Sequence, residues 1–270
     1  PGLNFSTPSA DVGSVGNSAL EPFISNNIDL GFEYYTGGEG FIGVAAFRKT
    51  VKGFTVNGTS TVPFSALEAF GVTYATLTPT QQAAIDSRGG PGAATVVLQQ
   101  QVNADGNLTV NGLEFTWVQP LDFLLEKHGL PGFGFTGNLT IIDQKGTGAA
   151  PAIATGVAPY TYNITGYYEN HGASVRVSKT FAKGSQSSGF NQNGIPEAAI
   201  YGDDFGQWDM SSSFNLNEMF GLNIPSSPEL TFDIINLFKE DQRSYFQYEN
   251  AAFTYYNPGR TFLIGFRGGF

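Results

Sequence analysis

Residues 27–51 read NIDLGFEYYTGGEGFIGVAAFRKTV, and the first eight of them alternate between polar or small side chains and apolar ones. Ile28, Leu30, Phe32 and Tyr34 are the apolar members, and Asn27, Asp29, Gly31 and Glu33 lie between them. A period of two residues is typical of a β-strand with one apolar and one polar face. The glycine-rich residues 36–40 follow, so this stretch predicts two strands, at 27–35 and 41–51, joined by a tight turn.

Alternation of the same kind recurs to the end of the chain. Seven further strands are predicted at about 112–121, 133–141, 160–168, 173–181, 207–216, 229–237 and 261–270. One short helix is predicted at 78–87, because Thr78 is a suitable N-cap and Pro79 suits the first helical position. Val96–Gln101 and Leu108–Val110 are expected to extend strands beyond the membrane. The chain is therefore expected to be all-β, with nine main strands.

The connections between these strands alternate strictly between two lengths. The shorter ones are at 36–40, 122–132, 169–172 and 217–228, and the longer ones are at about 52–111, 145–158, 182–206 and 239–258. Outer-membrane β-barrels have short periplasmic turns and long extracellular loops. The spacing predicts an antiparallel transmembrane β-barrel, with residues 1–26 as a further extracellular loop segment.

Composition narrows the class of protein. Aromatic residues make up 14% of the chain and charged residues only 13%, against a usual charged share of about 25%. Rings near strand ends are typical of the aromatic girdles of barrels. The net charge of −10 argues against nucleic-acid binding, and the absence of cysteine excludes disulfides and thiolate metal sites. No apolar run reaches the roughly 18–20 residues of a spanning helix.

Five stretches, taken together, resemble TonB-dependent outer-membrane receptors. They are VGNSALEPFISNNIDLGFEYYTGGEGFIGVAAFRKTVKGF (15–54), LTVNGLEFTWVQPLDFL (108–124), GLPGFGFTGNLTIID (129–143), APYTYNITGYYENHGASVRVSKTF (158–181) and NPGRTFLIGFRGGF (257–270). The resemblance covers most of residues 15–270 in order. It implies a 22-stranded barrel filled by a plug, of which the nine strands would be the last nine.

The resemblance also has consequences for completeness and partners. The first and last of nine antiparallel strands run parallel to each other, so the sheet cannot close on itself. We therefore expect a preceding part with a signal peptide, a TonB box, the plug and about thirteen strands, since the sequence starts at Pro1 without a signal peptide. The implied partners are this remainder of the receptor, the TonB complex, the barrel-assembly machinery and outer-membrane lipid.

The implied function is energised uptake of a bulky nutrient, namely a siderophore, haem, cobalamin or oligosaccharide, across the outer membrane of a Gram-negative bacterium. No enzymatic activity, cofactor or metal is expected, and His128 and His171 are interpreted as surface residues of the periplasmic turns. Two alternatives stay open. One is a soluble or surface-attached all-β module that binds carbohydrate or is structural, and the other is a passive porin.

Three groups of residues are candidates for function. Aromatic rings beside amides in the last two long loops suit a glycan or an aryl ligand, or else pack loop against loop: Phe190, Asn191, Gln192, Asn193, Tyr201, Tyr245, Tyr248 and Asn250. Charged residues on the expected lumen face could contact plug or substrate, or simply line a wet interior: Asp29, Glu33, Glu114, Arg176, Asp209 and Arg267. By resemblance, the terminal Phe270 is a signal for the barrel-assembly machinery, or a girdle ring.

Overall fold

The computed structural model describes residues 2–4, 12–37, 39–149, 151, 153–189 and 198–268. The chain folds into two compact units. The small unit comprises Pro1–Asn26, Thr50–Leu108 and Gly146–Ala152, and the sheet unit comprises Asn27–Lys49, Thr109–Lys145 and Ile153–Phe270. Each unit has its own sheet and its own kind of packing, so each is described by itself.

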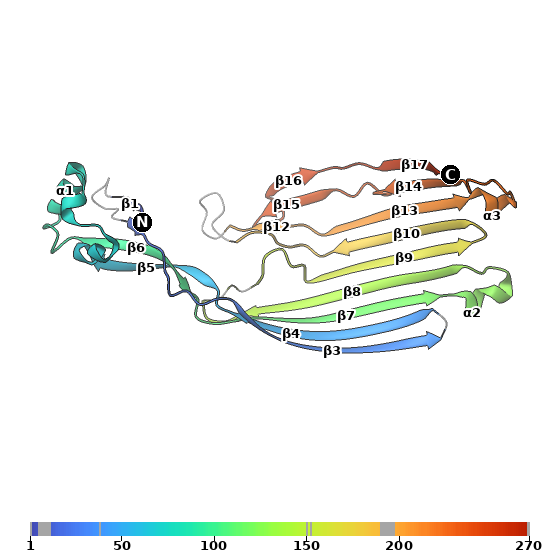
Figure 1. Cartoon of the computed structure of the whole chain (residues 1–270), viewed down its shortest axis with the longest axis horizontal. Helices are drawn as coiled ribbons and strands as arrows, with labels where there is room; N and C mark the ends of the chain where they lie inside the picture. Colours follow the sequence, from blue (N-terminus) through green and yellow to red (C-terminus); the bar gives the residue numbers. More distant parts are fainter. Residues whose placement is uncertain are drawn as a thin grey trace. The chain divides into compact units, whose positions relative to one another are not determined.

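A nine-stranded sheet forms most of the sheet unit (Figure 1). Its strands are β3 (Ile24–Gly37), β4 (Gly40–Lys52), β7 (Leu108–Pro120), β8 (Phe133–Gly146), β9 (Tyr160–Asn170), β10 (Ala173–Ala182), β13 (Phe205–Asn215), β14 (Glu229–Ile235) and β17 (Thr261–Arg267). Each strand pairs with the next along the chain, from β3 at one edge to β17 at the other. All nine strands predicted from the alternation are confirmed.

Short connections lie at one end of this sheet and long ones at the other, as the spacing predicts. Two short connections contain helices, namely α2 (Asp122–Leu125) with η3 (Glu126–His128), and α3 (Leu216–Phe220). Another is a two-residue turn in which His171 and Gly172 both have positive φ, the conformation that a tight hairpin requires. Two long connections form a second sheet, in the order β11 (Ser185–Gln186), β12 (Ile200–Gly202), β15 (Gln242–Phe246) and β16 (Ala252–Tyr256).

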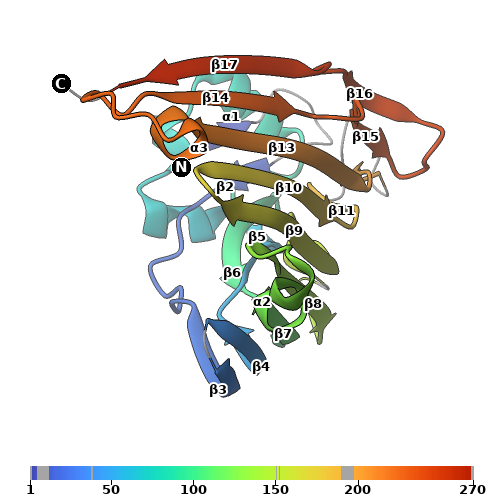
Figure 2. The same ribbon diagram turned by 90° about the vertical axis from the view of Figure 1, so that its right-hand side faces the viewer.

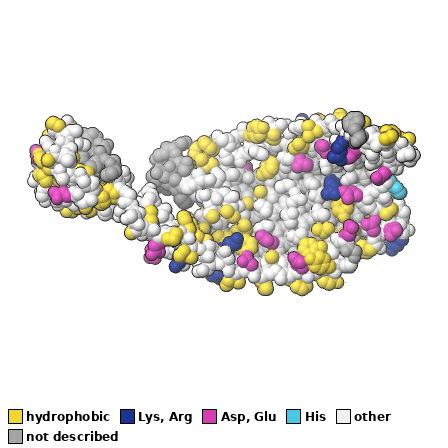
Figure 3. Space-filling view, in the orientation of Figure 1, with side chains coloured by type: hydrophobic (Ala, Val, Ile, Leu, Met, Phe, Trp, Pro, Cys, Tyr) yellow, Lys and Arg dark blue, Asp and Glu magenta, His cyan; other side chains and the backbone are white. Residues whose placement is uncertain are grey.

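The register separates a polar face from an apolar face. One row across β8 to β17 is apolar or glycine throughout: Phe135, Gly166, Val177, Met210, Ile234 and Phe262. A row on the opposite face is Asn138, Asn163, Thr180 and Gln207, in which Asn163 Nδ2 donates to Thr180 Oγ1 at 2.7 Å. The sheet is curved (Figure 2). Figure 3 views its concave side, where acidic and basic side chains are scattered among polar ones.

The apolar face is exposed, which is unusual for side chains of this size. Phe32 is 66% exposed, Ile264 78% and Phe266 73%. Among the described residues of the sheet unit, the buried apolar ones are only Ala198 and Ala199. A soluble module would need a closed apolar core under its sheet. This sheet has none in its described part, so its apolar face requires an apolar environment such as lipid.

Aromatic rings cover glycines on the polar face. A Cβ at Gly112 would overlap the ring of Phe47, and a Cβ at Gly134 would overlap the ring of Tyr167. Rings that cover strand glycines in this way compensate for the missing side chain. Each of these rings therefore occupies the space above a neighbouring strand.

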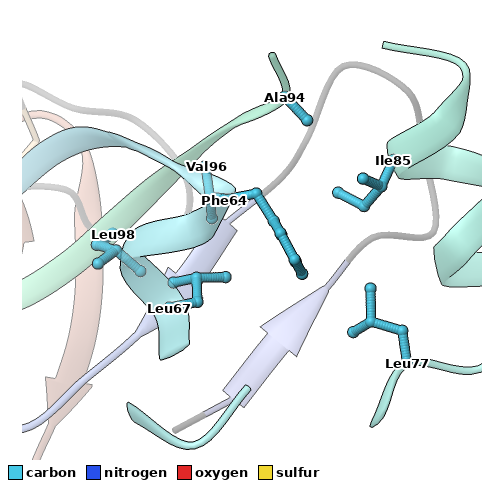
Figure 4. Close-up of a cluster of buried hydrophobic side chains, with 7 residues drawn as sticks. All are labelled: Phe64, Leu67, Leu77, Ile85, Ala94, Val96 and Leu98. Carbon is cyan, nitrogen blue, oxygen red and sulfur yellow. The ribbon is translucent and has the colours of Figure 1, made fainter. Parts of the chain in front are cut away.

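The small unit has an ordinary hydrophobic core. Its sheet has the order β1 (Gly2–Asn4), β2 (Val12–Ser14), β6 (Thr95–Asn103) and β5 (Thr55–Pro63). The helices η1 (Phe64–Phe70), η2 (Tyr74–Thr76) and α1 (Pro79–Asp86) complete it. Phe64, Leu67, Leu77, Ile85, Ala94, Val96 and Leu98 form the buried cluster, whose side chains point toward one another (Figure 4).

The prediction for this region was partly right. The helix at 78–87 is confirmed, with Thr78 as its N-cap accepting from the backbone N–H of Gln81. Leu108–Val110 begins β7, and the strand expected at 96–101 is present as part of β6, which belongs to the sheet of the small unit and not to the nine-stranded sheet. Residues 95–103 pair instead with β5 and β2, because Val96 and Leu98 are buried in the small core. No helix in the described residues is long and apolar enough to span a membrane.

Candidate functional site

Tyr201 and Tyr245, two of the predicted ligand-contact residues, lie side by side in the second sheet. Tyr201 on β12 and Tyr245 on β15 are register partners. Their rings are stacked, with centroids 5.6 Å apart and planes 13° from parallel. Burial, together with the nearby carboxylates of Glu249 and Asp203, raises the pKa of the Tyr245 hydroxyl. The hydroxyl thus stays protonated and can donate a hydrogen bond at physiological pH.

An arginine completes this surface. Arg243 lies two residues before Tyr245 on the same face of β15, and its guanidinium is 5.8 Å from the centre of the Tyr245 ring. Arg243 Nε donates to Asp203 Oδ2 at 2.8 Å, which fixes the plane of the guanidinium. Tyr255 on β16 is the register partner of Arg243, and its hydroxyl donates to Asp241.

These five residues, Tyr201, Asp203, Arg243, Tyr245 and Tyr255, are called the tyrosine–arginine cluster below. They offer aromatic faces, a planar cation and phenol hydroxyls on one side of a small sheet, a combination suited to flat or anionic ligands. Arg243 and Asp203 were absent from the predicted site. The sequence places Arg243 two residues before Tyr245, and this spacing could have indicated that both lie on one face of a strand. The contact between Arg243 and Asp203 could not be predicted, because it joins residues 40 positions apart through strand pairing.

The other predicted loop residues are not gathered into the cluster. Tyr248 and Asn250 lie between β15 and β16, and Tyr248 is 71% exposed. Phe190, Asn191, Gln192 and Asn193 lie outside the described residues, as does Phe270. Contact of any of these residues with a ligand, and the assembly role of Phe270, stay predictions.

The six predicted lumen residues lie in strands of the nine-stranded sheet, on its polar face. They are Asp29 and Glu33 on β3, Glu114 on β7, Arg176 on β10, Asp209 on β13 and Arg267 on β17. Glu33 and Glu114 border one hollow of about 470 Å³, together with Gly31, Gly43 and Thr116. Gly31 on β3 and Gly43 on β4 leave room for this hollow, which Phe41 and Ala45 of β4 also line.

Several of these charged groups are already paired within the wall. Arg176 pairs with Glu169 on the neighbouring β9, and Arg267 pairs with Glu229 on β14. The Asp209 Oδ1 atom accepts from the Gln207 amide and from the backbone N–H of Asn236, both at 2.8 Å. Both arginine side chains are at least half exposed, at 50% and 76%. Their contact with plug or substrate stays a prediction.

The two histidines lie in the short connections. His128 ends η3, and His171 occupies the two-residue turn between β9 and β10. Within the described part of the chain, no three His, Asp or Glu side chains are grouped closely enough to hold a metal ion.

An ion pair joins the tops of β10 and β13, outside the membrane-spanning strands. Lys183 Nζ donates to Asp204 Oδ2 at 2.7 Å, and the Gly184 N–H donates to Asp204 Oδ1 at 2.8 Å. The hydrogen bond from Lys183, and then the one from Gly184, lower the pKa of the Asp204 carboxyl. The same hydrogen bond to Asp204 raises the pKa of Lys183.

This pair predicts local opening in acid. A depressed carboxyl pKa adds stability above the unfolded pKa and loses it as pH falls through the folded value. A raised lysine pKa adds stability below its unfolded value and loses it as pH rises through the folded one. After correction for intrinsic exchange, amide exchange at Gly184 should therefore accelerate on acidification below about pH 4. In Asp204→Asn this acceleration should vanish, and an unchanged pH profile in that variant would contradict the assignment.

Solved outer-membrane transporters share this fold. The ferric enterobactin receptor PfeA from Pseudomonas aeruginosa aligns with a TM-score of 0.58 at 18% identity, over 96% of this chain and 33% of that one. The FrpB iron transporter from Neisseria meningitidis gives 0.55 at 11%, over 95% and 32%. The YddB outer membrane transporter from Escherichia coli gives 0.54 at 11%, over 97% and 34%. The chain thus spans about a third of the length of these proteins.

Comparison with protein-family models identifies the family of this chain. No curated protein sequence matches the chain. The family model for the TonB dependent receptor-like β-barrel matches residues 2–237. This range contains eight of the nine sheet strands and the small unit, and barrels of this family lie in the outer membrane of Gram-negative bacteria. The chain belongs to the TonB-dependent receptor β-barrel family.

Proposed function

We propose that this chain is part of the barrel wall and of the substrate vestibule of a receptor that takes up a bulky nutrient with energy from the TonB complex. The observation that carries the proposal is the curved nine-stranded sheet (Figure 2), polar on its concave side (Figure 3) and apolar on the opposite face by its register, in a chain of this family. The long connections, including residues 1–26, are extracellular in this proposal, and the short ones are periplasmic.

The partners follow from the same architecture. The edge strands β3 and β17 do not pair with each other, and open edges are not tolerated in lipid. The remainder of the receptor supplies the strands that close the barrel and the plug that contacts TonB. The barrel-assembly machinery inserts the protein into the membrane. No enzymatic step belongs to this function, since members of this family are receptors and transporters.

The tyrosine–arginine cluster is proposed as a contact for the nutrient in the vestibule. Its stacked rings suit a sugar or an aryl group, and Arg243 suits an anionic group beside that ring. Siderophores, haem, cobalamin and oligosaccharides each present at least one of these groups. The similar solved structures include an iron transporter and a ferric enterobactin receptor, which supports the siderophore class as the first to test.

Uptake by the full-length receptor tests this proposal. We expect accumulation of a labelled ferric siderophore, haem, cobalamin or oligosaccharide probe against its gradient in cells with TonB, and none in cells without it. The double variant Tyr245→Ala/Arg243→Gln should weaken binding of the transported probe about thirtyfold or more, because a ring contact contributes about 0.5–1.5 kcal/mol and a hydrogen bond to a charged group about 1.5–3 kcal/mol.

The matched control is Tyr256→Ala. Tyr256 pairs with Gln242, on the opposite face of the same hairpin, and it is 60% exposed. Equal binding by the double variant and this control would show that the cluster does not contact the nutrient. TonB-independent entry that only equilibrates the probe would favour the passive porin.

A further inference from the structure

Lys179 is a charged residue on the apolar face of the sheet. Its register partners are Ile164 on β9 and Trp208 on β13, and Val177 and Phe181 flank it on the same face of β10. A lysine at the bilayer midplane of a barrel costs about 2–4 kcal/mol, and the cost falls toward the interface. Its position three residues before the end of β10, at the long-connection end, is consistent with an interfacial site.

The Lys179 side chain is directed toward that end of the strand. Its Nζ is 5.3 Å from the centre of the Trp208 ring. Its Cε and Nζ lie 3.6 and 3.8 Å from the position that a Cβ would take at Gly206, two residues nearer the long connections. Among the described residues no acidic group pairs with Lys179, whereas Lys183 pairs with Asp204. The ammonium is therefore available to an anion from outside the chain.

An apolar hollow of about 450 Å³ lies one strand away on the same face. Trp117, Phe135, Leu139 and Tyr162 are among its walls, and Ile164, the register partner of Lys179, also lines it. The hollow exists because Gly137, opposite Ile164, has no side chain. Its lining side chains are aromatic or aliphatic except at Gly137 and Asn138, and neighbouring strands are only about 4.8 Å apart. A cation and an apolar hollow are thus adjacent on a surface that faces lipid.

We infer that Lys179 and this hollow bind one anionic membrane lipid, with a phosphate at Lys179 Nζ and an acyl chain in the hollow. Charge complementarity identifies the head group, and the apolar lining identifies the tail. Trp208 lies beside the head group, as indole rings do at membrane interfaces. The leaflet is the outer one, a point that rests on the proposed orientation of the receptor.

The distribution of other basic residues agrees with this inference. Two other basic residues lie on the apolar side at the long-connection end, namely Arg48 near the end of β4 and Arg260 just before β17. The Arg260 guanidinium is 5.9 Å from the centre of the Phe262 ring. Asp204 on this side is neutralised by Lys183. At the short-connection end, Arg176 and Arg267 lie on the polar face instead. Basic side chains therefore meet lipid at one end of the strands.

Lipid binding to the purified full-length receptor tests the inference independently of transport. Native mass spectrometry would count adducts of diphosphorylated lipid A, of neutral phosphatidylcholine and of inorganic phosphate. Lys179→Gln should lower lipid A occupancy about fivefold, the effect of one lysine near an anionic surface. Gly137→Leu should lower occupancy by both lipids, and Gly137→Ala less so. A Cβ at Gly137 meets only atoms at 3.6 Å or beyond, so these variants should fold.

Lys49→Gln is the matched control. Lys49 is also near the long-connection end of its strand, and its Nζ is 5.2 Å from the centre of the Phe47 ring, but it lies on the polar face. It should leave lipid A occupancy unchanged. Equal occupancy in Lys179→Gln and Lys49→Gln would overturn the inference, and so would undiminished lipid binding by Gly137→Leu. Binding of phosphate alone with the affinity of lipid A would overturn the lipid assignment, whatever the uptake assays show.

Discussion

Phe64→Ala is expected to destabilise the small unit strongly, so that it opens far more often, and to leave the nine-stranded sheet folded. Phe64 is 1% exposed and packs in the cluster with Leu67, Ile85 and Val96, which are equally buried. Truncating a buried phenylalanine costs about 3–5 kcal/mol, because the apolar contacts are lost and a cavity remains. A domain is stable by only about 5–15 kcal/mol in total. The loss therefore removes a large share of the stability of this unit.

Two measurements on the full-length receptor separate the units. Limited proteolysis should cut within residues 55–104 of the variant and spare the native protein. The heat-modifiable electrophoretic mobility of the barrel should be unchanged, since the sheet unit has no residue in this cluster. Phe70→Ala is the control, because Phe70 belongs to the same η1 helix but is 44% exposed. Loss of the folded barrel in Phe64→Ala would show that the two units fold as one.

Asn236→Ala is expected to release the loop between β14 and β17. Asn236 is 3% exposed and has a φ of 59°, in the left-handed region. Its Nδ2 donates to the carbonyls of Glu240 and Gly259, both at 2.9 Å, and its Oδ1 accepts from the Glu240 N–H at 2.7 Å. Alanine leaves these backbone groups unpaired, at about 1–3 kcal/mol each, and adds about 1–2 kcal/mol of backbone strain.

Hydrogen exchange across residues 237–260 measures this release, which should raise exchange rates by two orders of magnitude or more. Asn236→Gly keeps the backbone conformation but loses all three side-chain bonds, so it should resemble the alanine variant. Asn236→Asp keeps the acceptor and tolerates positive φ, so its effect should be smaller. Protection retained in the glycine variant would mean that the amide does not hold the loop.

The nine strands could be predicted because one face of each is selected for lipid. That selection makes the period of two visible along single strands, as at Ile28, Leu30 and Phe32. The tight turns were visible for a related reason, since they need residues such as Gly172 that accept positive φ. Pattern and conformation are both local here, so the sequence alone is sufficient.

The small unit could not be located in the same way. Its strand β5 reads TVNGTSTVP, which looks like a polar loop, and its short helices leave little periodicity. The core forms only when Phe64, Ile85 and Val96 meet from three segments. The tyrosine–arginine cluster has the same origin, because the aromatic residues were recognised singly, whereas the Tyr201–Tyr245 stack and the Arg243–Asp203 pair require a register between distant strands.

The rings of Phe47 and Tyr167, which cover Gly112 and Gly134, bear on how a cargo would move along the wall if the proposed function is right. In these positions the rings fill the space above glycines of the neighbouring strands, so they reach less far from the sheet than rings that stand away from it. Hydroxyl and amide groups such as Thr165, Ser178 and Asn163 lie on the same polar face, within hydrogen-bonding reach of one another's strands. A bulky cargo would exchange one weak hydrogen bond for the next, without a deep free-energy minimum in which it could become trapped.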